Sequence, residues 1–290
     1  MAVKTGPTLR RVQLGKELRR LRDRAGMTPA QAVEGLGFSE TKLWRVERGL
    51  TSLDKVQDLR NLCERYGLEV EEDIEFLVQI QRDSLSRDWW TPYRTVMPSG
   101  MATFVGLERD ARRIRAWEPG VVYGLLQSER YARAMFETAK PVEETTTEFV
   151  ERNIQLRMER KEVITRSEKP LELWVILGEA ALRQVFGGPD VMREQYALIA
   201  ELAKLDNVTV QVVPWATPTY RASRNFMLVE FEPPLLTTVE TDDTKSVNMV
   251  DKETEVWAYT RRFDAMAAGA LGPGETPKFL EQLAREQAES

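Results

Sequence analysis

The stretch MTPAQAVEGLGFSETKLWRVERG, residues 27–49, determines the fold of the N-terminal part of the chain. Thr28 supplies the hydroxyl of a helix N-cap, and Gln31, three residues later, completes the pattern of a capping box. A second helix start follows, because Gly37 permits a tight turn and Ser39 has a side chain suited to an N-cap. The stretch therefore predicts two short helices joined by a glycine turn.

Further helices are expected on both sides of this pair. Leucines recur every three or four residues in LGKELRRLRDRAG, residues 14–26, and this spacing predicts an amphipathic helix. The two short helices are expected at about 29–36 and 40–49, a fourth is expected to be capped by Ser52, and a fifth begins near Glu71. Two short capped helices within such a set are the parts of a helix-turn-helix module.

This region resembles the lambda-repressor-like helix-turn-helix domain of the XRE family. The resemblance covers about 55 residues and includes the end of the third helix, Val46-Glu47-Arg48-Gly49, which follows the family pattern of an aliphatic residue, Glu, any residue and Gly. It implies an all-α helix-turn-helix DNA-binding domain over residues 1–85, with double-stranded DNA as the ligand.

The third helix is expected to carry the base-reading side chains. If Leu43 and Val46 face the core, the opposite side of the helix points outward. The resemblance places Glu40, Thr41 and Arg45 at positions that read base edges in the major groove. Arginine can form two hydrogen bonds to guanine, and threonine can contact several bases. A carboxylate such as Glu40 in a first helical turn also stabilises the helix dipole, so this residue has two interpretations.

Other residues of this domain are candidates for contacts to the DNA backbone, which position a protein without specifying sequence. The candidates are Thr28, Gln31, Lys42, Trp44, Arg48, Arg10, Arg11, Arg19 and Arg20. A pair such as Arg19-Arg20 is also typical of an ordinary solvated helix face. Trp44 is large for a site that faces solvent, so it either packs on the fourth helix or on a partner, or lies on the DNA backbone.

The distribution of charge along the chain supports different binding partners for its two parts. Residues 1–66 contain 14 Lys and Arg and 8 Asp and Glu, whereas residues 67–290 contain 27 basic and 38 acidic residues. The net charges of +6 and −11 favour contact with a polyanion by the first segment alone. Chance segregation of solvated charges is the alternative explanation.

The rest of the chain is predicted to be mixed α/β. Residues 86–106 lack a sustained period but contain four aromatic residues, so they are expected to be a linker that packs on residues 107–290. We expect a helix over 107–119, and strands where LELWVIL, VTVQVVPW, NFMLVEF, LLTTVE and SVNMV occur, with helices between and after them. The fold class is therefore α+β overall, with an all-α first domain and a larger mixed α/β domain.

The second domain also carries a family resemblance. The segments at 117–136, 152–164, 171–215 and 226–231 resemble the C-terminal domain of actinobacterial Scr-type regulators. That resemblance implies an antitoxin-like transcriptional regulator of a toxin–antitoxin system, encoded beside a small partner protein.

Composition excludes much enzymology. The chain of 290 residues has no histidine, so catalysis and zinc binding by imidazole are excluded. Its one cysteine, Cys63, is expected in the core, and no nucleotide-binding or nucleophile motif is found. No cofactor, no metal and no catalytic residue are expected. The apolar runs fall short of the roughly 20 residues that a membrane helix needs, so we expect a cytoplasmic protein without membrane contact.

Three functions remain after these exclusions. The first is a sequence-specific transcriptional regulator, a homodimer whose C-terminal domain binds a partner protein or a small-molecule effector. The second is an antitoxin-like protein that sequesters a small toxin-like partner and autoregulates its own operon. The third is an enzyme fused to a DNA-binding domain. An aromatic set, Trp117, Tyr123, Tyr131, Trp215 and Tyr220, either lines a ligand pocket or is ordinary core.

Overall fold

The computed structural model describes residues 6–85, 88–232, 237–243 and 246–288. These form two compact units. The N-terminal unit contains the described residues up to Pro92 together with Ala102–Asp110, and the C-terminal unit contains Tyr93–Met101 and the described residues from Ala111 onward. The expected linker at 86–106 is thus shared between the two units rather than lying in one of them.

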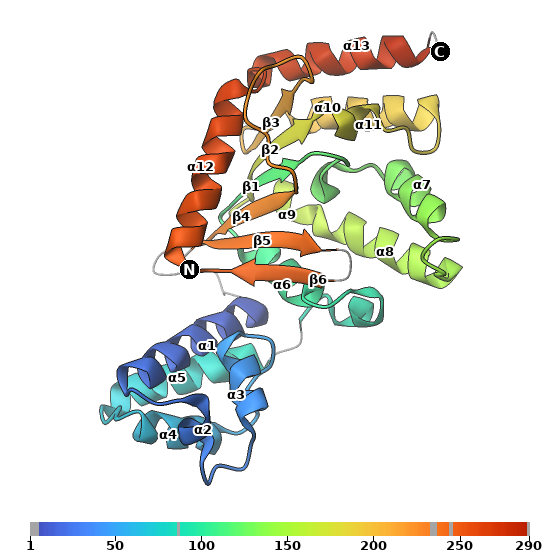
Figure 1. Cartoon of the computed structure of the whole chain (residues 1–290). Coiled ribbons are helices and arrows are strands. Elements are labelled where there is room, and N and C mark those ends of the chain that lie inside the picture. The colour runs from blue at the N-terminus through green and yellow to red at the C-terminus, as the bar shows by residue number, and fades with distance from the viewer. Residues whose placement is uncertain (1–5, 86–87, 233–236, 244–245, 289–290) are drawn as a thin grey trace. The chain divides into compact units, whose positions relative to one another are not determined.

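The N-terminal unit is all-α, as the sequence predicts (Figure 1). Its helices are α1 (Pro7–Arg24), α2 (Pro29–Val33), α3 (Glu40–Glu47), α4 (Val56–Arg65) and α5 (Glu71–Ser84), and α6 (Met101–Asp110) joins them through its residues from Ala102 onward. Leucines of α1, α3 and α4 form one continuous core with Ile74, Leu77 and Val78 of α5. Cys63 lies fully buried within this core, which confirms the expectation for this residue.

Helix boundaries differ from the sequence expectation at three places. α1 begins at Pro7 rather than Leu14, since proline suits a first helical position. α2 ends at Val33, before the expected Leu36, because Glu34 leaves the helical conformation and Gly35 adopts a positive φ of 71°. α4 begins at Val56 with Lys55 as its N-cap, so the expected cap at Ser52 is wrong.

The helix α6 is held to the start of α1 by polar contacts and by one glycine. The backbone N–H of Gly6 donates to the carboxylate of Asp110 at 2.9 Å. A Cβ atom on Gly106 would lie 2.2 Å from the hydroxyl of Thr8, so only glycine permits this approach. The same hydroxyl donates to Asp88 at 2.8 Å. Residues 88–110 therefore contribute in part to the N-terminal unit.

The C-terminal unit contains a mixed sheet of six strands in the order β3-β2-β1-β4-β5-β6. The strands are β1 (Arg113–Glu118), β2 (Glu172–Gly178), β3 (Val208–Val213), β4 (Phe226–Glu230), β5 (Thr238–Asp243) and β6 (Ser246–Val250). β1, β2 and β3 run parallel, and β4, β5 and β6 add in antiparallel fashion. The five predicted strands are confirmed as β2 to β6, although Leu235 and Leu236 of the predicted strand LLTTVE lie outside the described residues. The α+β class is confirmed as well, whereas β1 was not predicted as a strand.

The helix expected at residues 107–119 is wrong, because α6 ends at Asp110 and β1 occupies the centre of the sheet. The sequence Arg113-Ile114-Arg115-Ala116 alternates charged and apolar residues, which is the period of a strand. Both arginines pair across the sheet: Arg113 donates to Glu172 of β2, and Arg115 donates to Glu230 of β4, each at 2.7 Å. These partners are remote in the sequence and override the local helical spacing.

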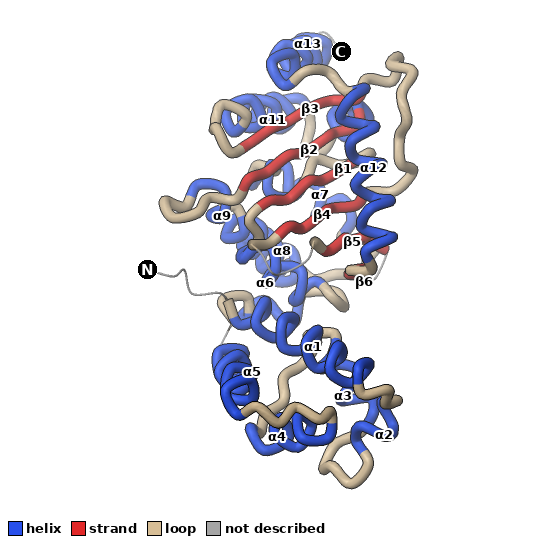
Figure 2. Tube along the Cα trace, turned by 90° about the vertical axis from the view of Figure 1, so that its left-hand side faces the viewer, coloured by secondary structure: helices blue, strands red, loops and turns tan. Residues whose placement is uncertain are grey.

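Helices cover both faces of this sheet (Figure 2). α12 (Glu253–Gly269) crosses one face, where Phe263 and Met266 pack on Trp117, Ile176 and Phe226. The opposite face is covered by α7 (Glu129–Ala139), α8 (Thr147–Arg160) and α11 (Pro189–Leu202). The remaining elements are α9 (Glu162–Thr165), α10 (Glu179–Arg183), α13 (Thr276–Ala288) and the 3-10 turns η1 (Thr91–Val96), η2 (Gly124–Leu126) and η3 (Pro273–Glu275).

Candidate nucleic-acid interface

Helix α3 is fixed in the N-terminal unit by its inner side. Leu43 and Val46 are buried in the common core. The Ser39 hydroxyl accepts a hydrogen bond from the Lys42 backbone N–H at 3.2 Å and so caps the helix, as the sequence predicts. The opposite side of the helix is consequently turned to solvent.

A buried ion pair joins α3 to α1. The Arg22 guanidinium donates to both carboxylate oxygens of Glu47, from Nε at 2.6 Å and from Nη2 at 3.0 Å, and donates from Nη1 to the Met27 carbonyl at 2.9 Å. The hydrogen bond that Arg22 donates to the Glu47 carboxylate raises the pKa of Arg22 above its ordinary value. One side chain thus connects α1, α3 and the loop that enters α2. Sequence reasoning assigned Glu47 only to a motif and missed its partner.

Two glycines allow α1 and the end of α3 to come unusually close. A Cβ atom on Gly15 would lie 2.3 Å from the Val46 carbonyl oxygen, a distance that real Cβ atoms do not reach. Gly49 ends the helix with φ of +67° and lies against Val12 of α1. Backbone contact between the helices therefore sets the position of α3 within the unit.

The outward side of α3 carries the three residues predicted to read bases. Glu40, Thr41 and Arg45 are all exposed, in the first and second turns of the helix. No hydrogen bond or ion pair involves the Arg45 guanidinium within the described part of the chain. The two interpretations of Glu40 both remain, because it occupies the first turn of α3 and is exposed.

Trp44 is not buried in the N-terminal unit. Its side chain is 46% exposed, and the Arg48 guanidinium lies 4.1 Å from the centre of its ring. This stacking holds a cation and a flat apolar surface together on the outward side of α3. Such a pair suits the sugar–phosphate backbone of DNA, which presents both charge and apolar sugar faces.

The start of α2 contributes two further candidates. Thr28 and Gln31 form the predicted capping box: the Thr28 hydroxyl accepts from the Gln31 N–H at 3.3 Å, and the Gln31 side-chain oxygen accepts from the Thr28 N–H at 2.9 Å. Both side chains are exposed. Lys42 forms an ion pair with Asp54 at 3.1 Å, an acid that is itself mostly exposed and easily displaced by phosphate.

Four arginines of α1 are less available than the sequence suggests. Arg11 is mostly buried and pairs at 2.8 Å with the buried carboxylate of Asp88, so its guanidinium is held by a structural partner. Arg10 lies 3.8 Å from Asp83. Arg19 and Arg20 are exposed and pair within α1, with Asp23 and Glu17 respectively, in the manner of a solvated helix face.

Arg65 supports the short helix α2 and was not found by sequence reasoning. Its Nη1 atom donates to the carbonyl oxygens of Gln31 and Ala32, both at 3.2 Å. These carbonyls lie where a helix of only five residues leaves acceptors without helical partners. A basic residue near the end of α4 gave no local signal of this role.

Family comparisons agree with the two-part architecture. A model described as Helix-turn-helix domain matches residues 13–76, which extend from α1 into α5. A model described as Domain of unknown function (DUF5753) matches residues 101–282, which is more than half of the chain. The chain belongs to the DUF5753 family. No curated protein and no solved structure gave a significant match.

The DUF5753 region contains the aromatic set singled out from the sequence, and the structure splits it. Trp117, Tyr123 and Tyr131 are buried and belong to the core. Trp215 and Tyr220 are 61% and 48% exposed, so the five side chains do not line one pocket. Within the described ranges, no group of three His, Cys, Asp or Glu residues could hold a metal ion, and no helix has the length and apolarity to cross a membrane.

Proposed function

We propose that this DUF5753 protein is a sequence-specific transcriptional regulator of the XRE type that inserts α3 into the major groove of double-stranded DNA. The helix-turn-helix match supports DNA binding and transcription regulation by the N-terminal unit. The observation that carries the finer proposal is the contrast between the two sides of α3. The inner side is fixed by the Arg22–Glu47 pair, whereas Arg45 on the outer side is exposed.

In this proposal, each exposed group has a defined partner on DNA. Arg45 donates to a guanine edge, Thr41 contacts the adjacent base, and Glu40 accepts from a cytosine amino group. The backbone is bound by Lys42, by the Trp44–Arg48 pair and by the start of α2. Arg10, Arg19 and Arg20 make smaller contributions after they exchange their acid partners Asp83, Asp23 and Glu17 for phosphate.

We further propose that the protein is a homodimer whose C-terminal unit binds a partner protein or a small effector and performs no catalysis. The net charge of −11 after residue 66 disfavours a second DNA contact. The lack of histidine removes the commonest acid–base residue. The likeness to Scr-type regulators supports a small partner encoded by a neighbouring gene.

Selection of bound sequences from random duplex DNA tests this function. The full-length chain is expected to enrich paired half-sites separated by about one helical turn or a multiple of it, because a dimer of helix-turn-helix units places two recognition helices that far apart. Light scattering of the same preparation is expected to return twice the 33.3 kDa mass of one chain. If no motif were enriched, the proposal of sequence-specific binding would be wrong. If the protein were a monomer that bound single half-sites, the proposal of a homodimer would be wrong.

A further inference from the structure

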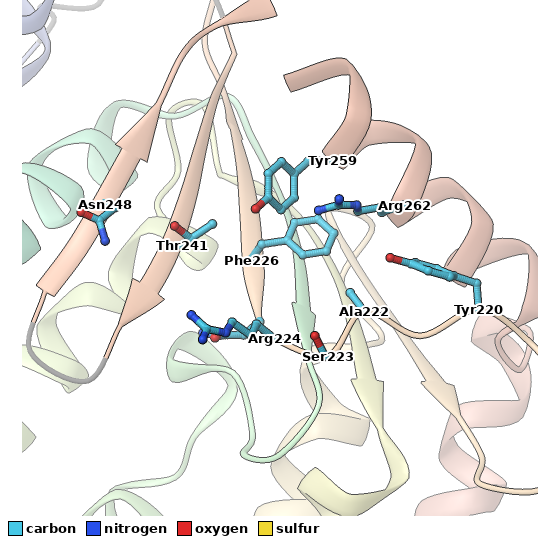
Figure 3. A pocket seen from close by; sticks show the side chains of 10 residues that line it. Tyr220, Ala222, Ser223, Arg224, Phe226, Thr241, Asn248, Tyr259 and Arg262 are labelled. Carbon is cyan, nitrogen blue, oxygen red and sulfur yellow. The ribbon is translucent and has the colours of Figure 1, made fainter. Parts of the chain in front are cut away.

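A cavity of about 310 Å³ opens on the α12 side of the sheet (Figure 3). Its walls come from three parts of the C-terminal unit: α12, the strands β5 and β6, and the segment at 220–226 that leads into β4. Its volume is within the range of small-molecule sites, which begin at about 300 Å³.

The segment at 220–226 is held in place by half-buried hydrogen bonds. The Arg221 guanidinium donates to the carbonyl oxygens of Pro214 and Thr217, both at 2.6 Å. The indole N–H of Trp117 donates to the Ala222 carbonyl at 2.9 Å. The cavity wall is therefore preformed, so that a ligand would not bear the full cost of ordering this segment.

Two arginines line this cavity without a hydrogen-bond or ion-pair partner in the part of the chain that the structure describes. Arg224 comes from the preformed segment and Arg262 from α12, and both are exposed. Neither has a hydrogen bond or ion pair with any described residue. Elsewhere in this acidic unit, arginines such as Arg113 and Arg115 are paired with glutamates. Two unpaired guanidinium groups at one cavity therefore favour an anionic ligand.

The same cavity offers flat apolar surface. The ring centres of Phe226 and Tyr259 lie 4.9 Å apart with an interplanar angle of 60°, and the Arg262 guanidinium lies 4.7 Å from the centre of the Tyr259 ring. Tyr220 stands at the wall beside α12 in Figure 3 and is half exposed. Thr241 and Asn248 on the opposite side add neutral hydrogen-bonding groups.

We infer that this cavity binds a small organic anion in which a phosphate or carboxylate group is attached to a flat ring. The oxyanion binds the guanidinium group of Arg224, whose planar donor set matches its oxygens, and Arg262 beside Tyr259 adds a second positive charge at the other end of the cavity. The ring lies against the aromatic wall that Tyr259 and Phe226 form. This inference deepens the proposed function, since it gives the effector a site and a chemistry.

Calorimetric titration of the full-length protein without DNA tests the inference. The probes are 5′-AMP and benzoate, and adenosine and benzamide are their uncharged counterparts. At least one anion is expected to bind saturably with one site per chain, and its uncharged counterpart is expected to bind at least about tenfold more weakly. Binding by 5′-AMP alone would identify a phosphate site, and binding by benzoate alone a carboxylate site.

Variants locate the site. Arg224→Gln and Arg262→Gln are each expected to weaken binding of the anion about tenfold or more. Arg261→Gln is the matched control, because Arg261 is an exposed α12 arginine that stacks on Trp257 at 4.8 Å and does not line the cavity. Thermal unfolding of each variant verifies that it is folded, and a variant that fails this check is replaced by the corresponding lysine substitution.

The outcomes that would overturn the inference are specific. The inference is wrong if neither anion binds saturably at millimolar concentration, or if the uncharged counterparts bind as tightly as the anions. It is also wrong if Arg261→Gln weakens binding as much as Arg224→Gln and Arg262→Gln do. Because these titrations contain no DNA, they fail or succeed independently of α3. A separate DNA titration with and without the anion then shows whether the site regulates operator affinity.

Discussion

Helix α1 of the N-terminal unit carries several arginines and helix α3 carries one, and the partners of these side chains differ. On α1, Arg11 pairs with Asp88, Arg20 with Glu17 and Arg22 with Glu47. On α3, Arg45 has no carboxylate partner in the described ranges. The comparison teaches that the net charge of +6 over residues 1–66 does not tell which arginines are free to bind a ligand, whereas the pattern of pairing does.

The first test of this comparison removes the carboxylate partner of a buried arginine in one variant and that of an exposed arginine in another. Glu47→Ala leaves the Arg22 guanidinium buried without its partner, which is expected to cost about 3–5 kcal/mol of stability in the N-terminal unit. Glu17→Ala breaks the exposed pair with Arg20 and is expected to cost less than about 1 kcal/mol. Hydrogen exchange of the core amides of α1 and α3 measures both, and equal losses would contradict the structural role of the buried pair.

The next effect concerns the approach of α3 to α1. Gly15→Ala places a Cβ atom against the Val46 carbonyl and is expected to cost about 1–3 kcal/mol, because the helices must separate. Gly37→Ala is the matched control, since a Cβ atom there meets nothing within 4 Å. Chemical unfolding followed by DNA titration measures the cost. If Gly15→Ala left both stability and DNA affinity intact, this contact would not position α3.

A smaller effect is expected when the loss of DNA affinity on replacing an unpaired arginine is compared with the loss on replacing a paired one. Arg45→Ala is expected to cost about 1–3 kcal/mol on the preferred site and to relax the choice of one base. Lys42→Ala is expected to weaken binding to all sequences alike. It is also expected to reduce the slope of the logarithm of the binding constant against the logarithm of salt concentration by about 1. Arg11→Ala is expected to leave DNA affinity unchanged when the variant is folded. A larger loss of affinity in Arg11→Ala than in Arg45→Ala would reverse the comparison.

The smallest effect is expected at Cys63. Burial raises the pKa of this thiol from 9.0 to about 11, so the folded protein holds it protonated at neutral pH. The stability that this shift contributes is present below pH 9 and is lost as the pH rises to about 11. At pH 8 a thiol-specific reagent is expected to react slowly with the native protein and rapidly in denaturant. Rapid reaction without denaturant would show that this core is open to solvent.

Local patterns predicted much of the fold and of the candidate site. The capping residues Thr28 and Ser39 follow from their side-chain type and their place before a helix, and the outward position of Arg45 follows from helix periodicity. What local patterns missed depends on residues far apart in sequence. The Arg22–Glu47 pair joins two helices, and β1 is a strand because distant segments supply its hydrogen-bonding neighbours.

The cavity beside α12 has the same origin. Arg224 and Arg262 are ordinary surface arginines in the sequence, and only the fold brings them to one opening. Nothing in the spacing of nearby residues distinguishes Arg221, which is bound to backbone carbonyls, from Arg224, which is not. Side-chain pairing across the fold is therefore the information that a single sequence conceals.

The central place of β1 in the sheet has a consequence for how the protein forms during synthesis. This strand pairs with β2, whose Glu172 lies 59 residues from Arg113, and with β4, whose Glu230 lies 115 residues from Arg115. Pairings of such separation form slowly, whereas helices with local contacts form fast. The N-terminal unit is complete once Asp110 has left the ribosome, more than a hundred residues before β4 is available. We therefore expect the nascent chain to fold its helix-turn-helix unit before the cavity beside α12 exists.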